Sequence, residues 1–283
     1  MRILVAGAIA LALVGGAHAQ GFSLDFNKLI EIGKKATQLQ PVDAAKEAEI
    51  GAGVASNLLG AAPLVNDPAL QRYVNRVGLW LALQTERTDV DWRFGVLDTA
   101  DLNAFATPGG YVFVTRGLIG IMRTEAELAG VLAHEIAHVL RKHHLNAIQK
   151  NAATGIGADA LAIFLDQKAS GLKREALDKV VNAGTELYAR GLDRDDELEA
   201  DRMGVVIAAR AGYEPYGLAA VLQRLAAVNP EAGPVALMFK THPKPADRLD
   251  ALEPVLAPAL EPYAAQPAAA ERFLGEATRA AKP

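Results

Sequence analysis

The 283-residue chain carries 29 lysine and arginine residues against 33 aspartate and glutamate residues, a formal net charge of −4. This balance argues against nucleic acid as a partner, because phosphate binding relies on basic surfaces. The chain has no cysteine, which excludes disulfides and a lipid attached through cysteine. We expect one sizeable domain with a helical extension.

The N-terminus is predicted to be a signal peptide over residues 1–19. Arg2 precedes an uncharged apolar run over residues 3–14, and a small-x-small sequence ends at Ala19, which indicates cleavage before Gln20. The run is too short to favour a retained membrane anchor. We therefore expect a protein of the bacterial periplasm, with secretion beyond it left open.

Residues 20–44 are expected to form an N-terminal extension with one amphipathic helix. Its polar face is not strongly basic, so packing on the domain is favoured over membrane binding. Peripheral membrane contact is left open but is not indicated. Two more helices are expected, one ending at about Leu59 and one starting after the Asp67-Pro68 cap.

Alternation of apolar and polar residues begins at Asp91 and predicts a small antiparallel sheet. Residues 92–97 alternate as one strand, and residues 103–106 and 111–114 form two strands about a tight turn. One of them is a candidate edge strand for a substrate backbone, with an ordinary hairpin as an equally weighted alternative. The candidate edge residues are Asn103, Ala104, Phe105 and Ala106.

A buried helix is expected near the middle of the chain. Thr124-Glu-Ala-Glu127 is a capping box, with Thr124 as N-cap. The helix is predicted to run from there to about Lys150. Residues 128–140 are largely apolar, so unpaired polar side chains on this helix would be costly.

This helix contains one His-Glu-x-x-His sequence. His134 and His138 are four residues apart, so they share one helix face and both imidazoles can bind one tetrahedral Zn²⁺. Glu135 points to the side of that pair, where it can act as general base on an attacking water. The sequence therefore predicts a metal centre on this helix.

Residues 151–185 are predicted to be a helical insertion that follows the metal-binding helix. Glycine, alanine and apolar residues dominate its first part. A lid, a dimer surface and a membrane-facing element are all compatible with this composition. The oligomeric state is left open.

An acidic helix expected after Tyr188 offers the third ligand. Catalytic zinc takes three protein ligands and keeps one position open, and Glu197 is the best third ligand. Asp201 lies one turn further, where it can accept the free ring N–H of a ligating histidine. Glu199 is an alternative ligand, but it points about 160° away from Asp201 by the 100° per residue rule.

Residues 239–249 contain a proline-rich loop with His242, and Arg248 begins the next helix. The oxyanion of the reaction needs one more donor, and Tyr188, His242 and Arg248 are candidates. His242 is also a candidate fourth metal ligand. Residues 253–283 are expected to form a loosely packed helical tail rich in alanine and proline.

With these motifs in view, the chain resembles the M48 family of zinc metallopeptidases, in particular its soluble exported bacterial branch. The resemblance covers most of residues 45–252 and rests on the Asn103–Leu118 stretch and the segments around His134, Glu197 and His242. It implies an α+β, mostly helical, zincin-like domain. It also implies zinc on His134, His138 and Glu197, Glu135 as general base, and Asp201 behind a ligand. In some relatives the corresponding loop histidine holds the enzyme latent.

The favoured function is that of an endopeptidase with one Zn²⁺ per chain, which cuts unfolded or misassembled envelope proteins. Two histidines and a carboxylate favour zinc over Mn²⁺ or Co²⁺. The alternative is a zinc-stabilised chaperone or assembly factor with latent proteolysis, in which His242 closes the site. A purely structural zinc domain fits poorly, because Glu135 would have no task.

Overall fold

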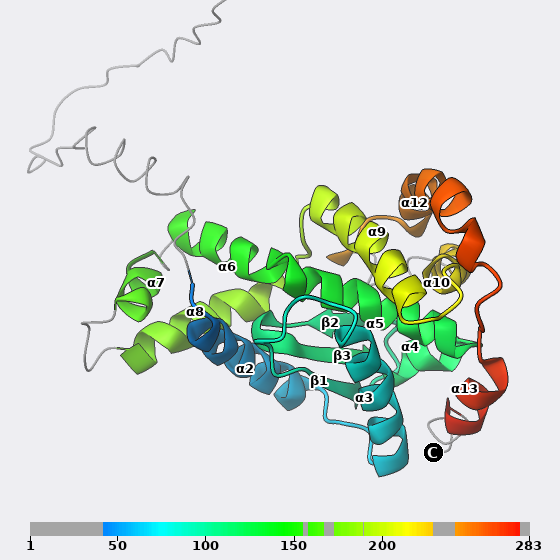
Figure 1. The fold of residues 1–283 in the computed structure, drawn as a ribbon. Helices are drawn as coiled ribbons and strands as arrows, with labels where there is room; N and C mark the ends of the chain where they lie inside the picture. Colours follow the sequence, from blue (N-terminus) through cyan, green and yellow to red (C-terminus); the bar gives the residue numbers. More distant parts are fainter. Residues whose placement is uncertain (1–41, 155–157, 167–172, 189, 229–240, 278–283) are drawn as a thin grey trace, which may run out of the picture. The chain divides into compact units, whose positions relative to one another are not determined.

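The computed structural model describes residues 42–154, 158–166, 173–188, 190–228 and 241–277. The predicted signal peptide and residues 20–41 of the predicted extension lie outside them. The elements are α2 (Ala44–Ala61), α3 (Pro68–Ala82), β1 (Arg93–Leu97), β2 (Ala104–Ala106), η1 (Pro108–Gly110), β3 (Tyr111–Thr115), α4 (Arg116–Ile121), α5 (Glu125–Leu140), α6 (His143–Thr154), α7 (Ala158–Leu165), α8 (Lys173–Leu187), α9 (Arg194–Arg210), α10 (Gly217–Ala226), α12 (Pro245–Ala259), η2 (Glu261–Tyr263) and α13 (Ala270–Ala277). The domain is mostly helical with one small sheet, as expected (Figure 1).

The sheet is mixed, with strand order β1-β3-β2. β2 and β3 pair antiparallel about the turn at η1, as predicted. β1 runs parallel to β3, so the prediction of a purely antiparallel sheet is wrong in this part. Two chain reversals separate β1 from β3, and they restore the original direction. Alternation identifies strands but does not define which of them pair.

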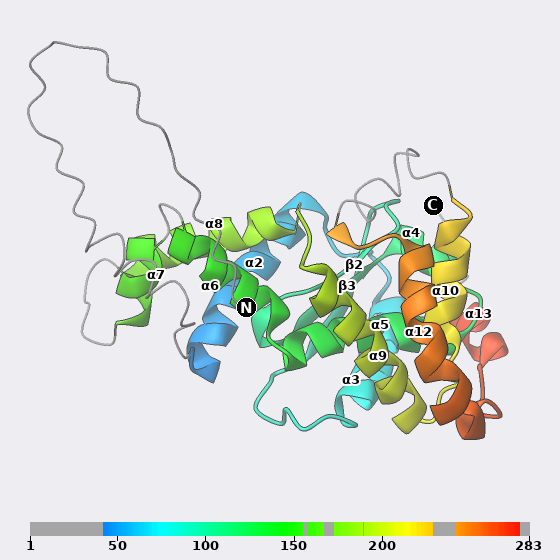
Figure 2. The ribbon, with the colours of Figure 1, turned by 90° about the horizontal axis from the view of Figure 1, so that it is seen from above.

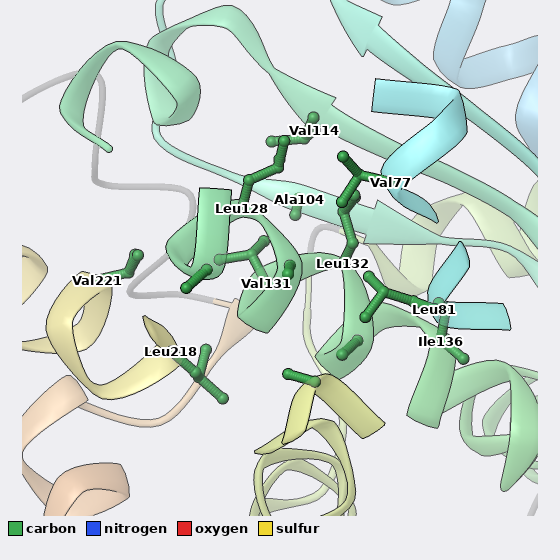
Figure 3. Packing of buried hydrophobic residues seen from close by; sticks show 14 of the residues in the cluster. Val77, Leu81, Ala104, Val114, Leu128, Val131, Leu132, Ile136, Leu218 and Val221 are labelled. Atoms are coloured by element: carbon green, nitrogen blue, oxygen red, sulfur yellow. The ribbon is translucent and has the colours of Figure 1, made fainter. Parts of the chain in front are cut away.

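Helix α5 forms the centre of the domain. All its residues from Glu125 to Val139 are buried, the ionisable ones included, in line with the largely apolar sequence of residues 128–140. The sheet and α3 cover one side of α5, and α9 and α10 cover the other. Figure 3 shows this packing, with Leu132 towards α3 and Val131 on the side of α10. Thr124 caps the helix and accepts the Glu127 N–H, as the capping box predicts.

Helix α5 ends at Leu140, ten residues earlier than predicted, and α6 follows from His143. The break occurs at Lys142, whose φ is +56°, in the left-handed region. The Lys142 ammonium lies 2.9 Å from the buried Glu47 carboxylate of α2. This tertiary ion pair accompanies a backbone angle that an L-residue adopts only at a cost.

Helices α2, α6, α7 and α8 lie together, apart from α10, α12 and α13 (Figure 2). They share a hydrophobic cluster that includes Ile50 and Val54 of α2, Ile148 of α6 and Val180 of α8. The described part of the predicted insertion is helical. Among the described residues, no helix is both long enough and apolar enough to cross a membrane.

Helix α13 of the tail contacts the domain through one buried residue, Phe273, while the loose packing expected for residues 253–283 stays a prediction. Phe273 of α13 is 1% exposed. Arg272 donates to the buried Glu125 carboxylate, and the hydroxyls of Tyr73 and Tyr213 donate to the same group, each at 2.8 Å. The tail therefore satisfies a buried charge at the start of α5.

Helices α5 and α9 are in such close contact at Gly204 that a methyl group added there should lower the stability of the fold. A Cβ on Gly204 would lie 2.8 Å from the His134 backbone nitrogen, whereas one on Gly60 of α2 would meet nothing within 4 Å. We expect Gly204→Ala to lower the free energy of unfolding by about 1–3 kcal/mol, measured by urea denaturation of the metal-free protein. Gly60→Ala, the control, should be neutral or stabilising. Equal stability of both variants would contradict this packing.

Candidate metal centre

Three side chains from α5 and α9 converge at the centre of the domain. His134 Nε2 and His138 Nε2 lie 3.0 Å apart. Glu197 of α9 brings Oε2 to 3.7 Å from His134 Nε2 and Oε1 to 3.6 Å from His138 Nε2. All three residues are at most 3% exposed. Two imidazoles and one carboxylate in this arrangement form a donor set that suits a tetrahedral divalent metal.

His242 comes to the same point from the loop before α12. Its Nδ1 lies 2.6 Å from Glu197 Oε2, and ligand atoms of His134, Glu197 and His242 all lie within 4.8 Å of one another. Burial would lower the pKa of His242, but the Glu197 carboxylate outweighs it and raises that pKa. His242 is therefore within reach of a metal held by the other three residues.

The protonation states also fit a metal. Burial lowers the pKa of His138 well below its ordinary value, and the neighbouring histidines lower it further. Burial alone would raise the pKa of Glu197, but the charge and hydrogen bond of His242 lower it to about 2. A neutral imidazole and an ionised carboxylate are the forms that bind a metal.

Asp201 and Arg248 lie behind His134. Asp201 Oδ1 is 2.9 Å from His134 Nδ1, so the imidazole proton resides on Nδ1 and the Nε2 lone pair is free. Arg248 Nε and Nη2 donate to the two Asp201 oxygens at 2.8 and 2.5 Å. Arg248 holds the pKa of Asp201 well below its usual range, against the effect of burial. The guanidinium therefore contacts the carboxylate that orients His134.

His143 is a residue that sequence reasoning missed. Its Nδ1 lies 3.0 Å from His138 Nδ1, and its Nε2 lies 3.2 Å from Glu199 Oε2. In a continuous helix a residue five positions after His138 points about 140° away from it, so the break at Lys142 allows this contact. The sequence signal for this contact is limited to the two histidines, His143 and His144, that follow the motif. Glu199, the alternative ligand, contacts His143 and Arg141.

Glu135 lies beside the ligands, on the same helix turn. The side chain is 3% exposed. Burial raises its pKa above the ordinary value, although His134 and His242 counter this effect. A carboxylate whose pKa moves towards neutrality is a better proton acceptor near pH 7.

β2 is one of the two outer strands of the described sheet and lies next to Glu135. Asn103 and Thr107 bond to β3, so the backbone groups of Ala104 and Ala106 point away from β3. On that side Asn103 Oδ1 accepts the Ala104 N–H at 3.0 Å. The Tyr188 hydroxyl donates to the Ala106 carbonyl at 2.5 Å. Tyr188 thus contacts the candidate edge strand.

The chain matches the model described as Peptidase family M48 over residues 68–255. It is 31% identical over 248 residues to the Beta-barrel assembly-enhancing protease of Escherichia coli (strain K12), a match covering 87% of this chain and 50% of that protein. It is 29% identical over 181 residues to the Mitochondrial metalloendopeptidase OMA1 of Schizosaccharomyces pombe, covering 64% and 51%. It is also 26% identical over 247 residues to Metalloprotease LoiP of Escherichia coli (strain K12), covering 87% and 92%.

The chain spans about half the length of the first two relatives. The family model, by contrast, covers more than half of this chain, including the His-Glu-x-x-His helix, Glu197 and His242. The chain therefore belongs to peptidase family M48.

Proposed function

We propose that the chain is a zinc endopeptidase. The observation that carries this proposal is the convergence of His134, His138 and Glu197 within 3.7 Å of one another, with Glu135 on the same helix turn. This donor set suits zinc, and Asp201 and His143 support its two histidines from behind. A structural zinc site would give Glu135 no role.

Each nearby residue has a task in peptide hydrolysis. A zinc ion, when bound, polarises the scissile carbonyl and lowers the pKa of a water molecule. Glu135 takes the proton of the attacking water and delivers it to the leaving amine. Asp201, fixed by Arg248, keeps the His134 proton on Nδ1. Tyr188 and His242 are the remaining candidates for a donor to the oxyanion.

The substrates we propose are unfolded or misassembled proteins of the bacterial envelope. Two observations support this class. One relative is named a beta-barrel assembly-enhancing protease. An edge strand binds an extended backbone with little regard to side chains, which favours unfolded segments. Export to the periplasm by the predicted signal peptide agrees with such substrates.

A second candidate function follows from His242. Its position 2.6 Å from Glu197 would let it become a fourth ligand and exclude water. The protein would then act as a zinc-stabilised chaperone or assembly factor whose proteolysis is latent. The two functions differ in whether removal of the imidazole activates the protein.

We expect Glu135→Gln to retain one zinc per chain and to lose cleavage of casein by a factor of about 10²–10⁴. The amide cannot accept a proton, while the fold and ligands are unchanged. Metal analysis and a casein assay on the same preparations measure both properties. Glu49→Gln, on the exposed face of α2, is the control and should match the wild type. Full activity of Glu135→Gln, free of contaminating protease, would remove Glu135 from the mechanism.

If His242 closes the site as a fourth ligand, we expect His242→Ala to cut casein faster than the wild type, because the variant lacks the imidazole that competes for the open metal position. The initial cleavage rate at equal zinc occupancy measures this effect. A slower rate would instead assign His242 as a donor to the reacting carbonyl.

We expect His143→Phe to weaken zinc binding about 10- to 100-fold, because His138 loses the partner of its Nδ1 proton. His143→Asn should retain most of the affinity, since its Oδ1 can stand where Nδ1 of the histidine accepts that proton. Competition with a chromophoric chelator gives the zinc Kd of each variant. Equal affinity of His143→Phe and the wild type would show that His143 does not orient His138.

A further inference from the structure

A cavity separate from the candidate metal centre lies where helices α3, α5 and α9 end. It encloses about 1060 Å³, its open mouth included, and its described lining contains none of the candidate metal ligands. Trp80 Nε1 of α3 donates to the Ala211 carbonyl at the end of α9 at 2.8 Å, which joins two of its walls. A cavity of this size can hold a small molecule.

The lining of this cavity is strongly basic, although the chain as a whole is acidic. Among the described residues, the charged lining side chains are Arg87, Arg141, Arg202, Arg210 and Glu86. Four cations against one carboxylate create a local positive potential, which attracts anions. A guanidinium also binds a carboxylate or phosphate through two parallel hydrogen bonds.

Two of the four arginines are held by acidic residues. Arg141 Nη2 lies 2.8 Å from Glu199 Oε1, and Arg87 Nε donates to Asp89 Oδ1 at 2.8 Å. Arg87 Nη1, however, is a buried donor that no group among the described residues accepts. An unpaired buried donor is costly, so an acceptor on a bound ligand would stabilise this arrangement.

The other two arginines lie on one face of α9. Arg202, Val206 and Arg210 are spaced by four residues, so they form a row along the helix. Arg202 and Arg210 are exposed, and neither has an acidic partner within the described part of the chain. A cation in the last turn offsets the partial negative charge of the final carbonyls, which accounts for Arg210. Arg202 lies in the middle of α9, where it has no such role.

The less exposed part of the lining is apolar. Leu140 of α5 and Met203, Val206 and Ile207 of α9 contribute to it. Val206 is 41% exposed, so part of this surface remains in contact with water. An alkyl chain would bury that surface and gain hydrophobic free energy, which a small hydrated anion cannot do. The cavity therefore combines two properties, a positive charge and an apolar wall.

We propose that this cavity binds an amphipathic anion, a molecule with a carboxylate or phosphate head and an alkyl chain. Arg202 and Arg210 bind the head, and Arg87 Nη1 supplies a further donor from the segment after α3. The alkyl chain packs against Val206 and the apolar residues beside it. A free fatty acid and a membrane phospholipid share this chemistry. The site does not depend on the proposed endopeptidase function.

Three small probes separate the contributions of charge and chain. We expect calorimetric titration of the zinc-loaded protein to show decanoate binding at least about tenfold more tightly than decyltrimethylammonium, which carries a similar chain and the opposite charge. Decanoate should also bind at least about tenfold more tightly than acetate, which has the head without the chain. Equal affinity for decanoate and either of the other probes would overturn the proposal.

Paired arginine variants locate the binding. Arg202→Gln/Arg210→Gln should weaken decanoate binding about tenfold or more, with the zinc Kd and the rate of casein cleavage unchanged. Arg72→Gln/Arg76→Gln removes the same charge from exposed positions of α3 outside the cavity and should bind decanoate normally. Unchanged binding by the first variant would place the ligand elsewhere, for example at the zinc, and would overturn the proposal.

A carboxylate added to the apolar wall tests the path of the chain. Val206→Asp should weaken decanoate binding about tenfold or more, because it places a negative charge and a polar group where the alkyl chain packs. Leu79→Asp is the control, since Leu79 is 44% exposed on α3 and does not line the cavity. Equal binding by both variants would contradict the proposed position of the chain.

Lipid vesicles distinguish the two sources of the ligand. Co-sedimentation with phosphatidylglycerol vesicles but not with phosphatidylcholine vesicles, lost in Arg202→Gln/Arg210→Gln, would assign the head to a membrane phospholipid. Decanoate binding without co-sedimentation would assign it to a free fatty acid. Binding of neither would overturn the proposal, as would tighter binding of an acidic peptide than of decanoate, which would indicate a protein partner.

Discussion

The structure depends on the complete burial of one helix that carries ionisable groups. Every residue from Glu125 to Val139 is buried, so α5 contributes apolar contacts on all sides of the core. The same burial removes water from two glutamates at its start and from the metal motif. Unpaired, these groups would be more costly than the surrounding hydrophobic contacts could offset. The rest of the fold is arranged to supply their partners.

These partners come from distant parts of the chain. The Glu125 carboxylate accepts hydrogen bonds from Tyr73, Tyr213 and Arg272, and the Glu127 carboxylate accepts one from Arg224. His134 is oriented by Asp201 and His138 by His143. The ends and the middle of α5 are thus tied to α3, α6, α9, α10 and α13. Helix α13 of the tail has a structural role, because its Arg272 neutralises a charge that the core requires.

The metal-binding motif and the helix that carries it could be predicted from the sequence, whereas the contacts between distant segments could not. The spacing of His134 and His138 and the capping box at Thr124 follow from helix periodicity, so the helix and its motif could be predicted. The direction of β1 depends on which strands pair, and the break at Lys142 has no glycine or proline to indicate it. The contact of His143 with His138 follows from that break.

The ion pair between Glu125 and Arg272 joins positions 147 residues apart. Contacts of this length determine the stage of synthesis at which the candidate metal centre can form. α5 is synthesised well before α9, α12 and α13, so its buried charges have no partners on a nascent chain. Contacts of such long sequence separation form late and slowly. A chain emerging from a ribosome or a translocation pore therefore lacks Glu197, the proposed third metal ligand, and helix α13 until most of the chain has passed. Delayed assembly of this kind would keep the proposed peptidase centre incomplete while the chain itself is still unfolded.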